Sequence, residues 1–187
     1  MEKLISFLIK AGRLKEKKRR EWNFFYDIKD SETAAAHVFR LSLLAWFLAR
    51  LEKELDLEKI LKMALVHNLC EAYLEGGTFM DPVLNKGTLP REVVQKRVRP
   101  QLSLEEWRKA KRGIFDEEQR CLDLVLADLS QDIKNEMKSF WLDYEKELSR
   151  EGRFLKQVDR IENLMQALEY SKEYSTIRKD YWIDGIG

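Results

Sequence analysis

The spacing of apolar residues is the feature that most constrains how this chain folds. Across most of its length, apolar residues recur every three or four positions, and the strict alternation typical of strands is almost absent. This is the period of an α-helix with one buried face. The three prolines all fall in one irregular stretch, 79–101. At 187 residues, with no internal repeat and no linker, the sequence predicts a single all-α domain, a helical bundle spanning residues 1–187.

Helix-capping residues and apolar stripes indicate where the helices lie. The expected helices cover the first ten residues, the segments after Asp30 or Ser31 and after Asp56, a short stretch opened by a capping box at Ser103, and residues 116–129, 133–148 and about 151–174. In the last helix we expect the buried face to contain Phe154, Leu155, Val158, Ile161, Met165 and Leu168, with Asp159 on its shoulder.

Charge and composition exclude several classes of function. The formal net charge is +1, so no overall electrostatic field attracts nucleic acid or an anionic membrane, and nucleic acid is an improbable partner. The longest strongly apolar stretch, 41–49, is far shorter than the roughly 18 residues that a membrane span requires. The two cysteines, Cys70 and Cys121, form no CxxC pair, which suits a reducing compartment. We therefore expect a soluble cytoplasmic protein.

The two histidines are the first candidates for chemistry. His37 lies on the apolar stripe of the second helix with Leu41, Leu44, Leu48 and Leu51. The stripe of the third helix, formed by Leu57, Leu61, Ala64 and Leu65, continues into Asn68 and Glu71, with His67 beside it. A single histidine at such a position is more often a hydrogen-bonded core residue than a metal ligand.

Their neighbours change this expectation. Three polar groups at the end of a buried stripe are costly unless they find partners. A divalent cation such as Mn, Co, Mg, Zn or Fe would satisfy them, because imidazole nitrogen and carboxylate oxygen are ordinary ligands. Asp159 supplies a further oxygen from a distant helix.

Three segments carry a resemblance to a known family. They are SETAAAHVFRLSLLAWFLA from Ser31, MALVHNLCEA from Met63 and FLKQVDRIENLMQALEY from Phe154. In order and separation they resemble the HD superfamily, specifically its small 5'-deoxynucleotidase-like branch of metal-dependent phosphohydrolases. The likeness runs from about Leu8 to Tyr174, and Asp159, Glu162, Gln166, Ala167, Glu169 and Tyr170 all match the last motif in register.

The resemblance implies a function and a set of site residues. By it, His37, His67, Asn68 and Asp159 bind the metal, and Glu71 is the catalytic residue that positions or deprotonates the attacking water. It also implies a small nucleotide substrate, a (deoxy)nucleoside 5'-monophosphate, and a homodimer. RLKEKKRREWNFF resembles the substrate-binding stretch, so Arg19 would contact the phosphate and Trp22 the sugar or base. A solvated basic run at a helix end explains the same residues about equally well.

Four departures from the family pattern affect this site. Asn68 stands where the family has the aspartate of its His-Asp pair, and Ala36, Glu75-Gly76 and Glu21 replace three other family residues. With Asn68, Asp159 is the only carboxylate left in the ligand set, which weakens metal binding.

Three functions therefore remain open. The first is hydrolysis of a nucleotide by metal-activated water. The second is a catalytically impaired family member that serves as a nucleotide-binding module, with Asn68 either natural or engineered. The third is nucleic-acid binding through the basic run 15–20 and the aromatic residues after it, which the balanced charge disfavours.

Overall fold

The computed structural model describes residues 1–19, 22–23, 26–52, 54–74, 104–175 and 177. The helices are α1 (Glu2–Ala11), η1 (Gly12–Lys15), α3 (Ala34–Ala49), α4 (Leu57–Val66), η2 (Leu69–Ala72), α7 (Leu104–Leu126), α8 (Gln131–Lys146) and α9 (Arg150–Tyr170), where η denotes a 3₁₀-helix. Within these residues the only strand-like pairing is an isolated antiparallel bridge between Lys18 and Thr33. The predicted all-α fold is confirmed.

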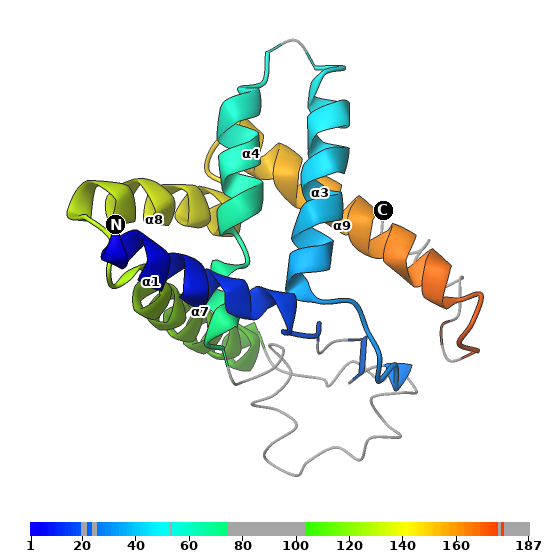
Figure 1. Cartoon of the computed structure of the whole chain (residues 1–187). Helices are drawn as coiled ribbons and strands as arrows, with labels where there is room; N and C mark the ends of the chain where they lie inside the picture. Colours follow the sequence, from blue (N-terminus) through cyan, green and yellow to red (C-terminus); the bar gives the residue numbers. More distant parts are fainter. Residues whose placement is uncertain (20–21, 24–25, 53, 75–103, 176, 178–187) are drawn as a thin grey trace.

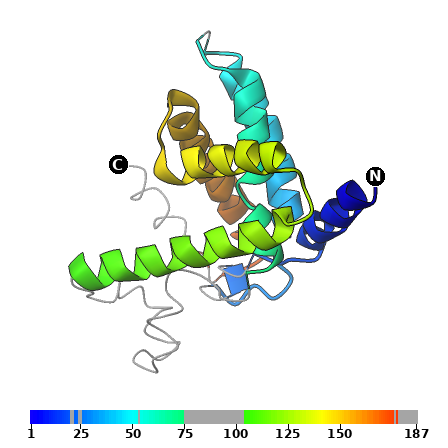
Figure 2. The ribbon, with the colours of Figure 1, turned by 90° about the vertical axis from the view of Figure 1, so that its left-hand side faces the viewer.

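The helices form two parts that meet at η2. In Figure 1, α3 and α4 run side by side, and α9 crosses behind them while α8 lies across α4. Below them, α1 and η1 lie beside α7, which Figure 2 shows as a long helix under the α3–α4 pair. The short η2 packs against α7 and η1. The chain segment that leaves α4 through His67 and Asn68 therefore enters the region where the two parts of the protein meet.

Side-chain caps start three of the helices. Asp56 begins α4 as predicted, its carboxylate accepting a hydrogen bond from the Lys59 amide, and Ser149 caps α9 in the same way. The predicted cap of α3 at Asp30 or Ser31 is wrong, because Thr33 caps that helix. The Ser31 hydroxyl instead donates to the carbonyl of Arg19, which ties the segment before α3 to residues 17–19.

Three clusters of buried apolar residues form the core. The largest two lie between α3, α4, α8 and α9, and between η2, α7 and Trp141 of α8. The third is small and aromatic; Trp22 and Ile28 pack there against Ala167 and Ile177. These clusters surround the polar groups at the ends of α3 and α4.

Several predicted helix limits and buried faces are wrong. The helix predicted over 116–129 is the second half of a longer helix, α7, which begins at Leu104 and already ends at Leu126. In α9, Ile161, Met165 and Leu168 are 43%, 39% and 45% exposed. The predicted Leu155 and Val158 are buried, but further along the helix the buried face carries Glu162, Gln166 and Ala167, because the second half of α9 packs against polar and basic side chains from α3.

The stripes of α3 and α4 also end earlier than predicted. Leu51 lies beyond the end of α3 and is exposed, and Leu65 faces outward from α4 while Ile60, Met63 and Val66 are buried. The predicted capping box at Ser103, the irregular stretch 79–101 and the departure at Glu75-Gly76 and Glu21 lie outside the described residues. Among the described helices, none combines the length and apolar character needed to cross a membrane.

Candidate metal centre

His37 lies in the first turn of α3 and is buried between two carboxylates of α9. Its Nε2 lies 3.2 Å from Oδ1 of Asp159, and its Nδ1 lies 2.5 Å from Oε2 of Glu162. Burial alone would lower the pKa of His37, but the hydrogen bonds to Asp159 and Glu162 outweigh it and raise that pKa. The two carboxylates thus hold the ring between them, one on each nitrogen.

His67 caps the carboxyl end of α4, and its ring lies next to that of His37. Its Nδ1 lies 2.8 Å from the carbonyl oxygen of Ala64, and the ring centroid is 5.6 Å from that of His37. Its Nε2 is buried and has no hydrogen-bond partner among the described residues. Burial, reinforced by the charge of His37, lowers the pKa of His67 to about 3, so the ring is neutral at physiological pH. A neutral imidazole nitrogen whose lone pair has no partner is able to bind a metal ion.

Asp159 completes the cluster from α9. The Tyr144 hydroxyl donates to its Oδ2 at 2.9 Å, and the Asn163 side-chain amide donates to Oδ1 at 3.1 Å. Burial acts to raise the pKa of Asp159, but the hydrogen bond and charge of His37 outweigh it and hold that pKa far below its usual range. The carboxylate is therefore ionised and fixed in orientation.

These three side chains fit a divalent cation. Each of His37, His67 and Asp159 offers one ligand atom, and these atoms lie within 4.8 Å of one another. Two imidazole nitrogens and one carboxylate oxygen make three protein ligands, the number that catalytic zinc sites use. The buried Nε2 of His67 is the specific observation that such an ion would explain.

The other two residues predicted after α4 lie on the turn into η2. Asn68 is partly buried at the first position of the turn, and its carbonyl accepts a hydrogen bond from the Glu71 amide at 3.0 Å. Glu71, also partly buried, is not one of the three residues whose ligand atoms converge. The roles predicted for these two residues stay predictions.

Arg19 and Trp22 lie on the segment that precedes α3. The Arg19 amide donates to the carbonyl of Glu32 at 2.9 Å, which aligns this segment with the start of α3. The positive charge of Arg19 opposes protonation of His37, His67 and Asp159, so its guanidinium lies within electrostatic reach of the cluster.

Trp22 is more buried than a residue that stacks on a ligand usually is. It is 1% exposed, and its ring packs against Tyr26 and edge-on against Tyr170. Its indole nitrogen donates to Oε1 of Glu32 at 3.3 Å. The predicted contact with sugar or base stays a prediction, and in this structure the ring is part of the aromatic core cluster.

Arg40 and its partners on α9 lie behind His37, and the sequence predicted no function for these residues. Arg40, one turn further along α3, donates to Glu162, Gln166 and Glu169 of α9. All three α9 residues belong to the family-like motif, so a signal was present in the sequence. The sequence does not show that all three side chains bind Arg40 of α3.

A second group of carboxylates lies near Glu71. Burial, followed by the charges of Glu145 and Glu71, raises the pKa of Glu118 to about 7, although Lys156 opposes this shift. Lys156 lies 3.6 Å from Glu145 and over the ring of Tyr144, which itself bonds Asp159. Nothing in the spacing of the sequence predicts this group, because its members come from η2, α7, α8 and α9.

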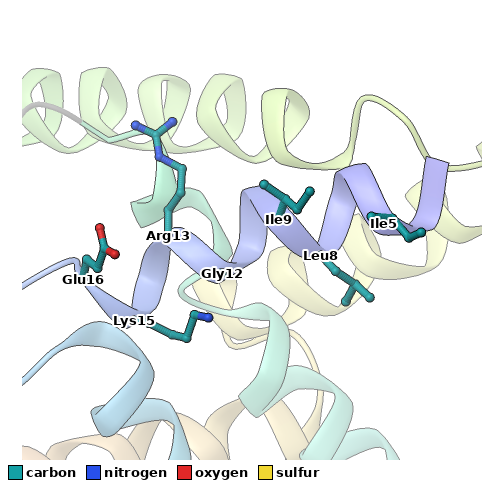
Figure 3. Close-up of a pocket in the computed structure, with 7 residues that line it drawn as sticks. All are labelled: Ile5, Leu8, Ile9, Gly12, Arg13, Lys15 and Glu16. Atoms are coloured by element: carbon teal, nitrogen blue, oxygen red, sulfur yellow. The ribbon is translucent and has the colours of Figure 1, made fainter. Parts of the chain in front are cut away.

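An open depression lies apart from these residues, along α1. Figure 3 shows its lining side chains, which are Ile5, Leu8, Ile9, Gly12, Arg13, Lys15 and Glu16. It shares no residue with the metal cluster.

Comparison with known proteins agrees with the geometry. The HD domain family matches residues 11–184. A bovine (Bos taurus) protein named 5'-deoxynucleotidase HDDC2 is 25% identical over 167 residues, covering 89% of this chain and 67% of its own. A protein of Saccharomyces cerevisiae named 5'-deoxynucleotidase YGK1 is 25% identical over 171 residues, covering 91% and 68%.

The fold has a counterpart among solved structures. A protein from Magnetospirillum magnetotacticum, described as a predicted metal-dependent phosphohydrolase, superimposes with a TM-score of 0.61 at 18% identity, covering 90% of this chain and 71% of its own. The match to the family covers most of the chain and includes His37, His67 and Asp159. This chain is a member of the HD domain family.

Proposed function

We propose that this protein is a metal-dependent phosphohydrolase that acts on a nucleotide, most directly a (deoxy)nucleoside 5'-monophosphate. The observation that carries the proposal is the convergence of His37, His67 and Asp159, with the Nε2 of His67 buried and unbonded among the described residues. The relatives named 5'-deoxynucleotidase support the choice of substrate class.

Four residues would hold the cation. His37 and His67 contribute their Nε2 atoms and Asp159 its carboxylate, while Asn68 would contribute its amide oxygen. When bound, a divalent cation supplies polarisation of the phosphoryl group and activation of water. Because Asn68 is neutral, the ligand set carries one negative charge, and we expect a weaker affinity than in a site with two carboxylates.

The remaining site residues would act on the substrate. Glu71 is the candidate for moving a proton to or from the attacking water, since a nearby carboxylate suits that role. Arg19 is the candidate for the phosphate, because a guanidinium donates two parallel hydrogen bonds to phosphate oxygens. Trp22 would shape the sugar or base subsite, and its packing against Tyr170 and its bond to Glu32 fix its position.

Phosphate release from a panel of ribo- and deoxyribonucleoside 5'-monophosphates tests the proposal. The assay is run with Mn²⁺, Co²⁺ or Mg²⁺ on the unsubstituted chain and on His37→Ala and Asn68→Asp. We expect turnover by the unsubstituted chain, loss of turnover in His37→Ala and an increase in Asn68→Asp. If only Asn68→Asp releases phosphate, the chain as it stands is an impaired enzyme. If neither form binds metal or releases phosphate, the hydrolase proposal is wrong.

We also propose that the protein is a homodimer. Large apolar side chains are exposed on α3, where Phe39 is 68% and Phe47 64% exposed, and on the adjoining α9, where Ile161 and Met165 are exposed. Surfaces of this kind mark contact sites between protein chains. Sedimentation equilibrium of the natural chain and of Phe47→Glu tests this: the variant should shift toward monomer, and a natural chain that sediments as a monomer would contradict the proposal.

We propose one HD domain over residues 1–187 and a cytoplasmic location. The two cysteines are free and buried, which suits a reducing compartment. Limited proteolysis, which should yield no stable separate fragments, and cell fractionation test these two points.

A further inference from the structure

Glu162 lies behind His37, on the side away from the cation ligands, and is fully buried. It is 0% exposed, and its Oε2 lies 2.5 Å from Nδ1 of His37. A buried carboxylate is costly unless both of its oxygens are bonded. Glu162 meets this condition, because its Oε1 accepts from Nε of Arg40 at 2.7 Å.

Arg40 in turn is held by neighbours on α9. Its Nη2 donates to Oε1 of Gln166 at 2.6 Å, and its Nη1 donates to Oε2 of Glu169 at 2.7 Å. The guanidinium is therefore fixed against three side chains on successive turns of one helix. Through Arg40 and His37, both on α3, this arrangement holds the two carboxylate oxygens of Glu162 in place relative to that helix.

The two histidines of the cluster have the same arrangement. In each, Nδ1 is bonded on the side away from the cluster, to Glu162 for His37 and to the Ala64 carbonyl for His67. A carbonyl can only accept, so His67 carries its proton on Nδ1 and leaves Nε2 with a lone pair. A carboxylate in the same place favours a proton on Nδ1 of His37, so that with a cation in place of the contact between Nε2 and Asp159 the neutral ring would be the Nδ1–H tautomer.

We propose that Glu162, held by Arg40, is a positioning residue that fixes the Nδ1–H tautomer and ring orientation of His37, so that Nε2 is presented to the divalent cation. This inference rests on the metal site of the proposed function. A carboxylate behind a ligating imidazole also makes it a stronger donor.

The variant Glu162→Gln tests the proposal because glutamine keeps the shape but has one acceptor oxygen for two donors. If that oxygen faces Arg40, the amide NH₂ faces His37, and Nδ1 must become an acceptor, which moves the ring proton to Nε2. We expect the dissociation constant for Mn²⁺, measured by isothermal titration calorimetry, to rise about 10- to 100-fold.

Glu169→Gln is the matched control. It removes charge from another partner of the same Arg40, but Glu169 is half-exposed and does not contact His37. We expect its Mn²⁺ affinity to stay within about twofold of the natural chain, since exposed ion pairs contribute little. Equal affinity in the natural chain and a folded Glu162→Gln would overturn the proposal. Equal losses in Glu162→Gln and Glu169→Gln would also overturn it.

A second measurement needs no variant and covers the case in which Glu162→Gln does not fold. The chain has only two histidines, so their ring ¹⁵N signals are few. With diamagnetic Zn²⁺ bound, we expect Nδ1 of His37 to be protonated and Nε2 to be the coordinated nitrogen. Coordination through Nδ1, or failure of the natural chain to bind any cation, would refute the inference. Cation binding with this tautomer but without nucleotide hydrolysis would contradict the proposed function alone.

Discussion

Glu118 gives the clearest quantitative test of the electrostatics around the site. It lies on α7, partly buried, and faces the charges of Glu145 and Glu71 as well as that of Lys156. Burial and the two like charges raise its pKa from the usual 4.5 to about 7. The charged form is therefore disfavoured in the folded protein, and the neutral amide in Glu118→Gln removes that cost.

The sign and size of the effect follow from proton binding. Between pH 4.5 and 7 the folded chain holds a proton on Glu118 that the unfolded chain has lost, so this group lowers stability as pH rises through that window. The rise in pKa corresponds to at most about 3 kcal/mol. Because water still reaches the side chain, we expect a smaller effect. The substitution Glu118→Gln should change the free energy of unfolding more favourably at pH 8 than at pH 4, by about 1–2 kcal/mol.

Urea unfolding of both proteins at pH 4, 6 and 8, followed by circular dichroism, measures this difference. Glu117→Gln is the matched control one residue away. Its side chain is 43% exposed and the hydrogen bond that it accepts from Arg120 lowers the pKa of Glu117, so this variant should lose a little stability at pH 8 and gain none. If the free energies of unfolding of Glu118→Gln and of the unsubstituted chain differ by the same amount at pH 4, 6 and 8, the reasoning is refuted.

Three further predictions concern packing and capping. In Gly152→Ala the new Cβ would lie 2.7 Å from the backbone oxygen of Asp143, so we expect a loss of about 1–3 kcal/mol, measured by urea unfolding. Thr33→Ala removes the cap that accepts from the Ala36 amide and should cost about 1 kcal/mol, whereas Thr33→Ser should restore most of it. Leu41→Ala empties a fully buried position in the core and should cost about 2–5 kcal/mol; a cost under 1 kcal/mol would mean that this core collapses around the gap.

The local sequence was sufficient to predict the helices with strong caps and one clear face. Asp56 was predicted to start α4 and does so, and the break near Ser130 separates α7 from α8. Prediction failed where a helix buries polar groups. Ile161 and Met165 looked like core residues on α9, yet the face that packs inward carries Glu162. Hydrophobic periodicity cannot find such a face, because its burial depends on a basic partner elsewhere in the chain.

In the candidate site too, the sequence predicted the residues but not their contacts. The sequence alone determined the all-α class, the family motifs and the identity of the ligand candidates His37, His67 and Asp159, because these depend on residue type and spacing. Only the tertiary structure decided that their ligand atoms converge within 4.8 Å and that Arg40 fixes Glu162 behind His37. The contacts between α3 and α9 join residues more than 100 positions apart, and their geometry depends on how these two helices pack, which no local pattern encodes.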